Sequence, residues 1–186
     1  MEYQAPTTST LLGKLLVAAP DQADSVFDHA MVLVIEHSER GAIGLVVNQL
    51  SLTGTDELAP EWNSLVSEPS VLFAGGPIDH DALITLGRTA NLDGDLVLGL
   101  HSIDLDDQPD MVESSGIEEI RIFSGYVGWL EGQLEDEVMF ESWWVFEPRV
   151  EDIFASDPSE SWQKVLMRQP EPYSWYANFP DMVRAN

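Results

Sequence analysis

Two apolar runs separated by a short polar turn constrain the fold of this chain most strongly. The runs are residues 31–35 and 42–47, and the turn-forming sequence Ser-Glu-Arg-Gly occupies residues 38–41. The first run does not alternate apolar and polar residues, which is typical of a strand covered on both faces. A glycine-ended turn between two such runs predicts an antiparallel hairpin with Gly41 at a positive φ. We therefore expect a β-hairpin in the interior of the protein.

Further apolar runs predict more strands and a few helices around this hairpin. The helical spacing of Leu58, Trp62 and Leu65 predicts one amphipathic helix between residues 55 and 66, with Pro60 in its first turn. The mixed order of strands and helices, with no repeat or linker, favours a single α+β domain over residues 1–186. The other expected strands are 15–18, 71–74, 83–86, 96–100, 117–127 and 142–146, and the other expected helices lie near 111–112, at 130–138 and from 157 onward.

The last helix has a well-defined predicted start. Asp157 is expected to accept a hydrogen bond from the amide at N3, Pro158 suits position N1, and Glu160 stands at the N3 position of a capping box. The tail that follows Pro170 is too aromatic for a free disordered end, so we expect it to pack across the body of the protein. Its aromatic residues are Trp175, Tyr176 and Phe179.

The balance of charge restricts the partners of the protein. The chain has 33 Asp and Glu residues against 8 Lys and Arg, which gives a formal net charge of -25. Nucleic-acid affinity comes largely from Lys and Arg that neutralise phosphates, so direct DNA binding is not expected. The same charge disfavours an anionic membrane surface, and no apolar run approaches the roughly 20 residues of a membrane-spanning helix. The chain also has no cysteine, which excludes disulfides and cysteine-ligated metals.

The N-terminal residues do not resemble a secretion signal. Glu2 stands where a signal peptide carries basic residues, and Lys14 interrupts the short apolar stretch 11–19. We interpret this stretch as containing the first strand and expect a cytoplasmic protein.

Several short blocks, taken together in order and spacing, resemble the AlgH/YqgE family of bacterial proteins. They span nearly the whole chain. The blocks are Leu-Val-Ala-Ala-Pro at 16–20 with Phe27, Val-Ile-Glu-His at 34–37, Gly-Ala-Ile-Gly-Leu-Val-Val-Asn at 41–48, Gly-Gly-Pro at 75–77, Gly-Tyr-Val-Gly-Trp at 125–129, Gly-Gln-Leu-Glu at 132–135, and Ile153-Phe154 leading to Trp162.

The resemblance implies a compact α+β fold of coiled mixed sheets, mainly antiparallel, packed with a few helices. It also implies a cytosolic protein without an established activity, and some family members are labelled transcriptional regulators. This chain departs from the family pattern at Gln49-Leu50, where a Lys-Pro pair commonly follows the asparagine. A basic residue at that position therefore has no part in its function.

Motifs of common enzyme classes are absent from the chain. The nucleophile elbow, the P-loop, the dinucleotide fingerprint and the zincin pattern are not found. The acidic segment 104–110 lacks the glycine and the bidentate glutamate of a calcium loop. The four histidines show no metal-ligand spacing. We therefore expect no metal, no cofactor and no catalytic residue that a motif identifies.

Three places remain as candidate ligand-binding corners. Glu36 and His37 end a buried strand, where they can form a proton-transfer pair, act as metal ligands, or simply form a hydrogen-bonded strand terminus. Gly75 and Gly76 can expose backbone amides to an anion or can form a tight turn where two backbones cross. At a strand-to-helix junction, polar side chains can recognise a ligand beside a tryptophan, or the corner can serve packing alone. The junction residues are Trp129, Gln133 and Glu135.

These residues lead to three hypotheses about function. The first is a non-enzymatic binding or regulatory protein that contacts a protein or a small ligand. The second is a hydrolase or transferase with a cleft around Glu36, His37 and Glu135. The third is a transcriptional regulator that acts indirectly, without direct DNA contact and without a membrane. If the family blocks form one site, six residues should line a single cleft. They are Glu36, His37, Asn48, Gly76, Trp129 and Gln133.

Overall fold

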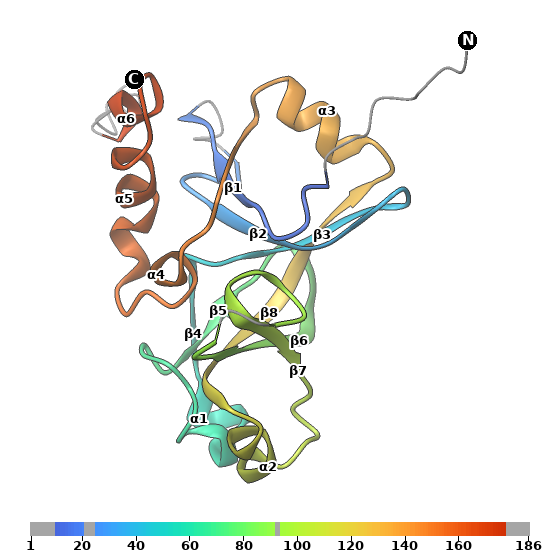
Figure 1. Ribbon diagram of the computed structural model, residues 1–186, viewed down its shortest axis with the longest axis vertical. Helices are drawn as coiled ribbons and strands as arrows, with labels where there is room; N and C mark the ends of the chain where they lie inside the picture. Colours follow the sequence, from blue (N-terminus) through green and yellow to red (C-terminus); the bar gives the residue numbers. More distant parts are fainter. Residues whose placement is uncertain (1–9, 21–24, 92–93, 178–186) are drawn as a thin grey trace.

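The computed structural model describes residues 10–20, 25–91 and 94–177 (Figure 1). The expectations for Glu2 and Phe179 lie outside these residues. Within them, no helix is long and apolar enough to cross a membrane. Strands dominate the centre of the molecule, and short helices lie around them.

One long strand, β8 (Ile117–Leu130), connects the two halves of the sheet. Its first part pairs with β6 (Ile78–Thr89), and its last four residues pair with β3 (Gly41–Val46). The change of partner occurs near Gly125, which has a φ of 71°. A Cβ there would lie 2.6 Å from the carbonyl oxygen of Gly76, so only glycine fits this crossing.

The first half of the sheet contains the predicted hairpin. Strands β2 (Met31–Ser38) and β3 pair antiparallel, and β1 (Leu15–Ala18) and β9 (Trp143–Phe146) extend the sheet in the order β3-β2-β1-β9. Gly41 has the expected positive φ, at 127°. A Cβ at Gly41 would lie 2.0 Å from the carbonyl oxygen of Trp129, so the turn and β8 require glycine together.

The second half of the sheet is mixed. Strand β5 (Val71–Ala74) pairs antiparallel with β4 (Leu50–Gly54) and parallel with β8. Strand β7 (Leu100–Ile103) pairs antiparallel with β6. A mixed, mainly antiparallel sheet with several helices confirms the predicted α+β class.

Two predicted elements differ from the observed ones. The single helix expected between residues 55 and 66 is two short pieces, α1 (Thr55–Leu58) and the 3-10 helix η2 (Pro60–Trp62). Pro60 starts the second piece because proline has no amide to continue the first. The strand expected at 96–100 begins as the 3-10 helix η3 (Val97–Gly99), because Leu98 and Gly99 both have positive φ values that a strand excludes.

Of the remaining helices, those at 150–153 and 173–176 are not among the predicted ones, and the others lie close to their predicted positions. The remaining helices are α2 (Pro109–Ser114), α3 (Gln133–Met139), α4 (Val150–Ile153), the 3-10 helix η4 (Pro158–Glu160), α5 (Ser161–Met167) and α6 (Tyr173–Tyr176). Asp157 is the N-cap of η4, although its side chain accepts from the N2 amide of Ser159 rather than from N3. The aromatic tail packs on the body as expected, since the ring of Tyr173 lies 5.1 Å from that of Trp144.

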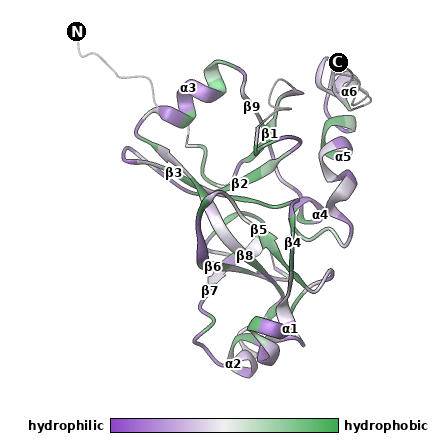
Figure 2. Ribbon diagram, turned by 180° about the vertical axis from the view of Figure 1, so that it is seen from behind, coloured by the Kyte–Doolittle hydropathy of each residue, from purple (hydrophilic) through white to green (hydrophobic). Residues whose placement is uncertain are grey.

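The two faces of the hairpin are buried in different cores. Alternate residues of β1 and β2 face a core that includes Trp162, Val165 and Leu166 of α5. The other residues of these strands face a second core with Leu134 of α3. Figure 2 shows the central strands coloured as hydrophobic, while hydrophilic colour gathers on much of α3 and at the tip of the hairpin. The helices α3 and α5 therefore cover opposite faces of one sheet.

Candidate functional site

Two adjoining cavities lie beside the start of β2, and the first of them lies next to α5. The first, here the polar cavity, has a volume of about 310 Å³, and the second, here the apolar cavity, has about 210 Å³. Gln49 lines both. The other residues of the polar cavity are Asp28, His29, Asn48, Pro158, Ser159, Trp162 and Gln163, and those of the apolar cavity are Val26, Phe27, Val46, Ala74, Gly76, Pro77 and His80.

Asn48 holds the backbone that forms the edge of the polar cavity. Its Oδ1 accepts from the amide of Met31 at 2.9 Å, and its Nδ2 donates to the carbonyl of His29 at 2.9 Å. His29 has a φ of 54°, an uncommon conformation for a residue with a side chain. Such backbone strain persists only where surrounding contacts hold it, and it is concentrated at functional sites. The carboxamide of Asn48 supplies one of these contacts.

The imidazole of His29 is fixed by two neighbours. Its Nδ1 lies 2.7 Å from Oδ1 of Asp28, and its ring packs edge-on at 4.3 Å from the ring of Trp162. Trp162 in turn donates its indole N–H to the carbonyl of Ala18 at 3.0 Å. The side chain of His29 is 43% exposed. The polar cavity thus presents an oriented imidazole to solvent.

Gln49 stands between the two cavities and is held weakly. Its Nε2 donates to the carbonyl of Val26 at 3.4 Å, near the upper limit for a hydrogen bond. Among the described residues, no Lys or Arg lines either cavity. Gln49 is also where the chain departs from the Lys-Pro pattern of the family it resembles. The lining groups are therefore amides, a hydroxyl, imidazoles and one carboxylate, next to an apolar recess.

Gly75 and Gly76 lie where the chain after β5 crosses β8. The amide of Gly75 donates to the carbonyl of Ser124 at 2.8 Å, and its carbonyl accepts from the amide of Val46 at 2.8 Å. A Cβ at Gly76 would lie 2.2 Å from the backbone of Tyr126. The glycines therefore permit the close approach of two backbones, and Gly76 also forms part of the apolar cavity.

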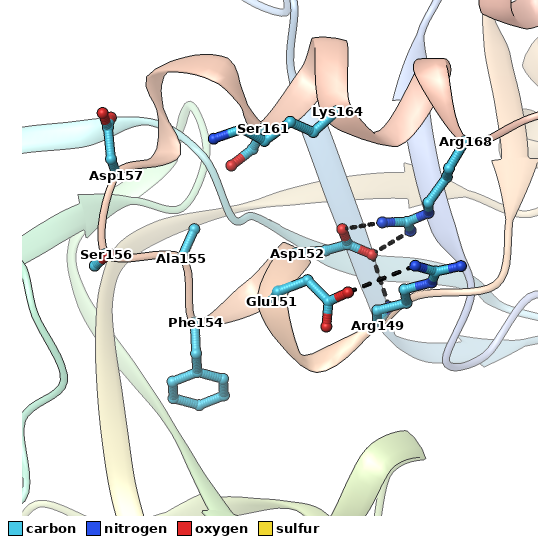
Figure 3. Close-up of a pocket in the computed structure, with 10 residues that line it drawn as sticks. All are labelled: Arg149, Glu151, Asp152, Phe154, Ala155, Ser156, Asp157, Ser161, Lys164 and Arg168. Carbon is cyan, nitrogen blue, oxygen red and sulfur yellow. Dashed lines mark hydrogen bonds and ion pairs between the residues drawn. The ribbon is translucent and has the colours of Figure 1, made fainter.

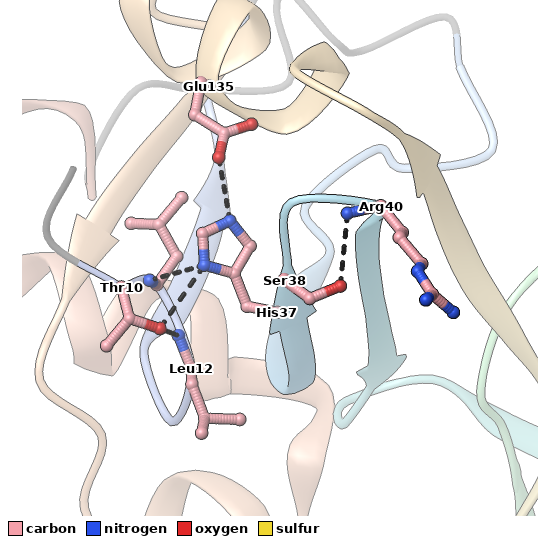
Figure 4. Close-up of polar contacts among 7 residues, drawn as sticks. Thr10, Leu12, His37, Ser38, Arg40 and Glu135 are labelled. Atoms are coloured by element: carbon pink, nitrogen blue, oxygen red, sulfur yellow. Dashed lines mark hydrogen bonds and ion pairs between the residues drawn. The ribbon is translucent and has the colours of Figure 1, made fainter.

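His37 lies on the face of the sheet that α3 covers, and both of its ring nitrogens have partners there (Figure 4). Its Nδ1 accepts from the amide of Leu11 at 3.1 Å and lies 3.3 Å from Oγ1 of Thr10. Because a backbone amide can only donate, the proton of the neutral ring resides on Nε2, which contacts Oε1 of Glu135 at 2.8 Å. The imidazole therefore joins three segments of the chain.

Trp129 and Gln133 form a second network on the same face. The indole N–H groups of Trp129 and Trp143 both donate to Oε2 of Glu137, at 2.9 Å and 2.8 Å. Gln133 donates to Oε1 of Glu137 and accepts from the amide of Leu130. Trp129 is buried in the core under α3. These polar groups are satisfied by one another.

The single cleft expected from the family blocks is not formed by the described residues. His37, Trp129, Gln133 and Glu135 meet under α3, whereas Asn48 lines the polar cavity next to α5 and Gly76 lines the apolar cavity. Glu36 is exposed and points away from His37, because neighbouring side chains of a strand project from opposite faces. Among all the residues that the structure describes, no group of three His, Asp or Glu residues is arranged to hold a metal ion.

Sequence reasoning missed most of the residues that line the cavities, among them Asp28, His29, Gln49 and Gln163. His29 depends on a backbone conformation and on a contact with Trp162 that no local pattern reveals. Gln163 follows the predicted apolar residue Trp162 in its helix, and no motif distinguishes it. Gln49 carried a usable signal, since it was the point of departure from the family pattern.

The comparisons with known proteins agree in one family. A family model described as AlgH-like (DUF179) matches residues 15–174. A UPF0301 protein of Rhodococcus opacus is 38% identical over 184 residues, which cover 94% of this chain and 90% of that protein. A UPF0301 protein of Streptomyces avermitilis is 35% identical over 184 residues, covering 93% of this chain and 94% of that protein.

Two solved structures share the fold. The crystal structure of protein DIP2367 from Corynebacterium diphtheriae superposes with a TM-score of 0.84 at 29% identity, covering 96% of this chain and 95% of that one. The solution structure of the AlgH protein from Pseudomonas aeruginosa gives a TM-score of 0.63 at 26% identity, with 90% and 91% coverage. Since the family model spans most of the chain and close relatives match it nearly end to end, this chain belongs to the AlgH-like family.

Proposed function

We infer that this chain is a non-enzymatic binding protein whose ligand occupies the polar and apolar cavities on either side of Gln49. The observation that carries this proposal is the shared position of Gln49, whose side chain donates a long hydrogen bond of 3.4 Å to Val26 that is easily exchanged. When its side chain turns aside, the two cavities form one continuous groove. Binding sites are typically concave and mostly preformed, with a few polar groups that set orientation.

The lining defines the chemistry of the ligand. One end offers amide, hydroxyl and imidazole groups, and the other offers Val26, Phe27 and Pro77. A ligand with a polar end and an apolar end fits this division. Asp28 is the carboxylate of the lining, no Lys or Arg is present, and the chain has a net charge of -25. The ligand is therefore neutral or cationic. It is either a small molecule or one residue of a partner protein, which inserts its side chain and its backbone amide.

The contacts of His37 favour binding over the hydrolase or transferase hypothesis. A general base needs a free lone pair, but Nδ1 of His37 accepts from Leu11 and Nε2 contacts Glu135. Glu36 projects from the other face of the strand. A regulatory role is compatible with the same groove, and the acidic charge supports a route through protein contacts rather than DNA.

Three derivatives of one amino acid test the proposal by ligand-observed NMR. They are N-acetyl-leucine methylamide, leucinamide and N-acetyl-leucine, which differ mainly in charge. We expect the neutral and cationic compounds to bind more tightly than the anionic one. We expect Gln49→Phe, which fills the junction of the two cavities, to weaken their binding by about tenfold.

Leu52→Phe is the matched control, because Leu52 is fully exposed on the same segment and lines neither cavity. The two variants should unfold at the same temperature as the parent protein. Equal binding to Gln49→Phe and Leu52→Phe, or no binding of any of the three compounds, would contradict the proposed site.

A further inference from the structure

A third cavity, larger than the polar and apolar cavities at about 540 Å³, lies between α4 and α5 (Figure 3). Helix α5 separates it from the polar cavity. Ser161, Lys164 and Arg168 line the larger cavity, and their spacing of three and four residues places them on one face of the helix. Trp162 and Gln163, which line the polar cavity, lie on other faces. The larger cavity and the polar cavity therefore lie on different faces of α5 and have different linings.

Basic residues are concentrated at this larger cavity. The whole chain has only 8 Lys and Arg residues, and three of them, Arg149, Lys164 and Arg168, line it. Three acidic residues also line it, so the lining carries no formal net charge in a protein whose net charge is -25. The acidic residues are Glu151, Asp152 and Asp157. What an anion meets here therefore depends on which of these charges are already bound to one another.

Arg168 and Asp152 form a fixed pair. The guanidinium donates to both carboxylate oxygens, at 2.6 Å and 2.5 Å, and Asp152 also accepts from the amide of Arg149 at 2.7 Å. Their side chains are only 16% and 4% exposed. Breaking a buried bidentate pair is costly because it leaves an uncompensated charge. This pair therefore forms a rigid wall of the cavity, and Arg168 does not leave Asp152 to bind a ligand.

Arg149 and Lys164 are held much more loosely. Arg149 lies 3.7 Å from Glu151, and Lys164 lies 3.2 Å from Glu160. All four side chains are more than half exposed. Ion pairs of this kind contribute about 0–1 kcal/mol, so a competing anion replaces the carboxylate partner at little cost.

Asp157, the third acid of the lining, is already occupied. Its Oδ1 accepts from the amide and the hydroxyl of Ser159 at 3.1 Å and 2.6 Å. These bonds hold the carboxylate at the turn before η4. The carboxylates elsewhere on the surface repel an anion weakly, because charges beyond the Debye length of about 8 Å are largely screened at physiological salt.

We propose that this cavity binds a small organic anion, with Arg149 and Lys164 exchanging their surface carboxylates for a carboxylate or phosphate group of the ligand. The exposed hydroxyl-bearing residue Ser156 and the buried Ser161 supply polar neighbours in the same lining. The volume is within the usual range for sites that take small metabolites. This site is independent of the groove at Gln49 and takes ligands of the opposite charge.

The test uses calorimetric titration with three probes at physiological ionic strength: succinate, inorganic phosphate and the neutral analogue succinamide. We expect succinate or phosphate to bind the intact protein and succinamide not to bind. The stronger of the two anions identifies a carboxylate or a phosphate as the preferred group. Absence of binding by both anions up to about 10 mM would overturn the proposal.

Two double variants with the same charge change make the test specific. Arg149→Gln with Lys164→Gln should weaken binding of the anion by about tenfold or more. Lys14→Gln with Arg40→Gln removes two positive charges that do not line the cavity and should leave the affinity nearly unchanged. If both double variants lose affinity equally, the effect is a general one of net charge and the site is refuted. Arg168 is kept in every variant, because its removal would leave the buried carboxylate of Asp152 without its positively charged partner.

Discussion

The Nε2 atom of His37 lies 2.8 Å from Oε1 of Glu135, 98 residues further along the chain. The opposite ring nitrogen accepts from the amide of Leu11. One imidazole thus joins the segment before β1, the end of β2 and the first turn of α3. The arrangement needs the neutral ring with its proton on Nε2, because Nδ1 must act as an acceptor.

We expect His37→Phe to lower the free energy of unfolding by about 1–3 kcal/mol, because the amide of Leu11 and the carboxylate of Glu135 each lose a partner. Urea denaturation measures the change. His101→Phe is the control, since His101 contacts the 81% exposed side chain of Asp95 and should change stability by less than about 0.5 kcal/mol. Equal effects of the two substitutions would show that the His37 contacts do not stabilise the fold.

Arg121 gives a second prediction about stability. Its side chain is buried, with 1% exposure, and its guanidinium donates to the carbonyls of Ile153, Glu68 and Ala155. It also lies 4.1 Å from the ring centre of Phe73. Burial lowers the pKa of Arg121 to about 10, and nearby Glu119 opposes this shift, so the group stays cationic at neutral pH.

Replacing Arg121 by Met removes three hydrogen bonds and leaves buried carbonyls without donors. We expect a loss of about 3 kcal/mol or more in the free energy of unfolding, measured by chemical denaturation. Arg88→Met is the comparison, because Arg88 pairs with Glu118 and Glu119, which are partly exposed, and should cost much less. A loss no greater than that of Arg88→Met would mean that Arg121 is replaceable by apolar packing.

Local patterns predicted those parts of the fold that depend on local chemistry. The hairpin around Gly41 follows from apolar runs and one glycine, and both are visible in the sequence. The break at Pro60 was misjudged because a proline in a first turn and a proline between two turns look the same in sequence. Spacing along the chain could not reveal that His37 faces α3, because a bulge between Val34 and Glu36 shifts the register and changes which face each later residue of β2 takes.

The candidate site was less predictable than the fold. Asn48 was identified as a polar residue at a strand end, but its function in holding His29 depends on a backbone conformation. His29 meets Trp162, which is 133 residues away in the chain, through tertiary packing. The larger cavity was missed because Arg149, Lys164 and Arg168 form no motif. They come together only when α5 packs beside α4.

The acidic charge predicts how the protein behaves toward DNA. With a net charge of -25, it should not retain duplex DNA in a gel-shift assay near physiological salt. The positive charges of the larger cavity do not change this expectation, because three basic side chains in a recess do not form an extended basic surface. Salt-sensitive micromolar binding to generic duplex DNA would refute it and would revive a direct regulatory role.

The N-cap Asp157 provides a prediction with a defined pH dependence. The hydroxyl and the amide of Ser159 hydrogen-bond its carboxylate and hold the pKa of Asp157 below its ordinary value of 3.8. A carboxylate with a lowered pKa in the folded state stabilises the fold above its unfolded pKa, and this contribution disappears as the pH falls through the folded pKa.

Asp157→Ala should therefore unfold at a lower temperature than the parent protein at pH values above about 3.8, and the two melting temperatures should converge in more acidic solution. Scanning calorimetry across this range measures the difference. Asp107→Ala, an exposed loop substitution, should follow the parent protein at every pH because its removal breaks no cap. A difference between Asp157→Ala and the parent that stays constant into strong acid would show that the carboxylate charge of Asp157 does not stabilise the start of η4, and that the side chain acts there through its shape alone.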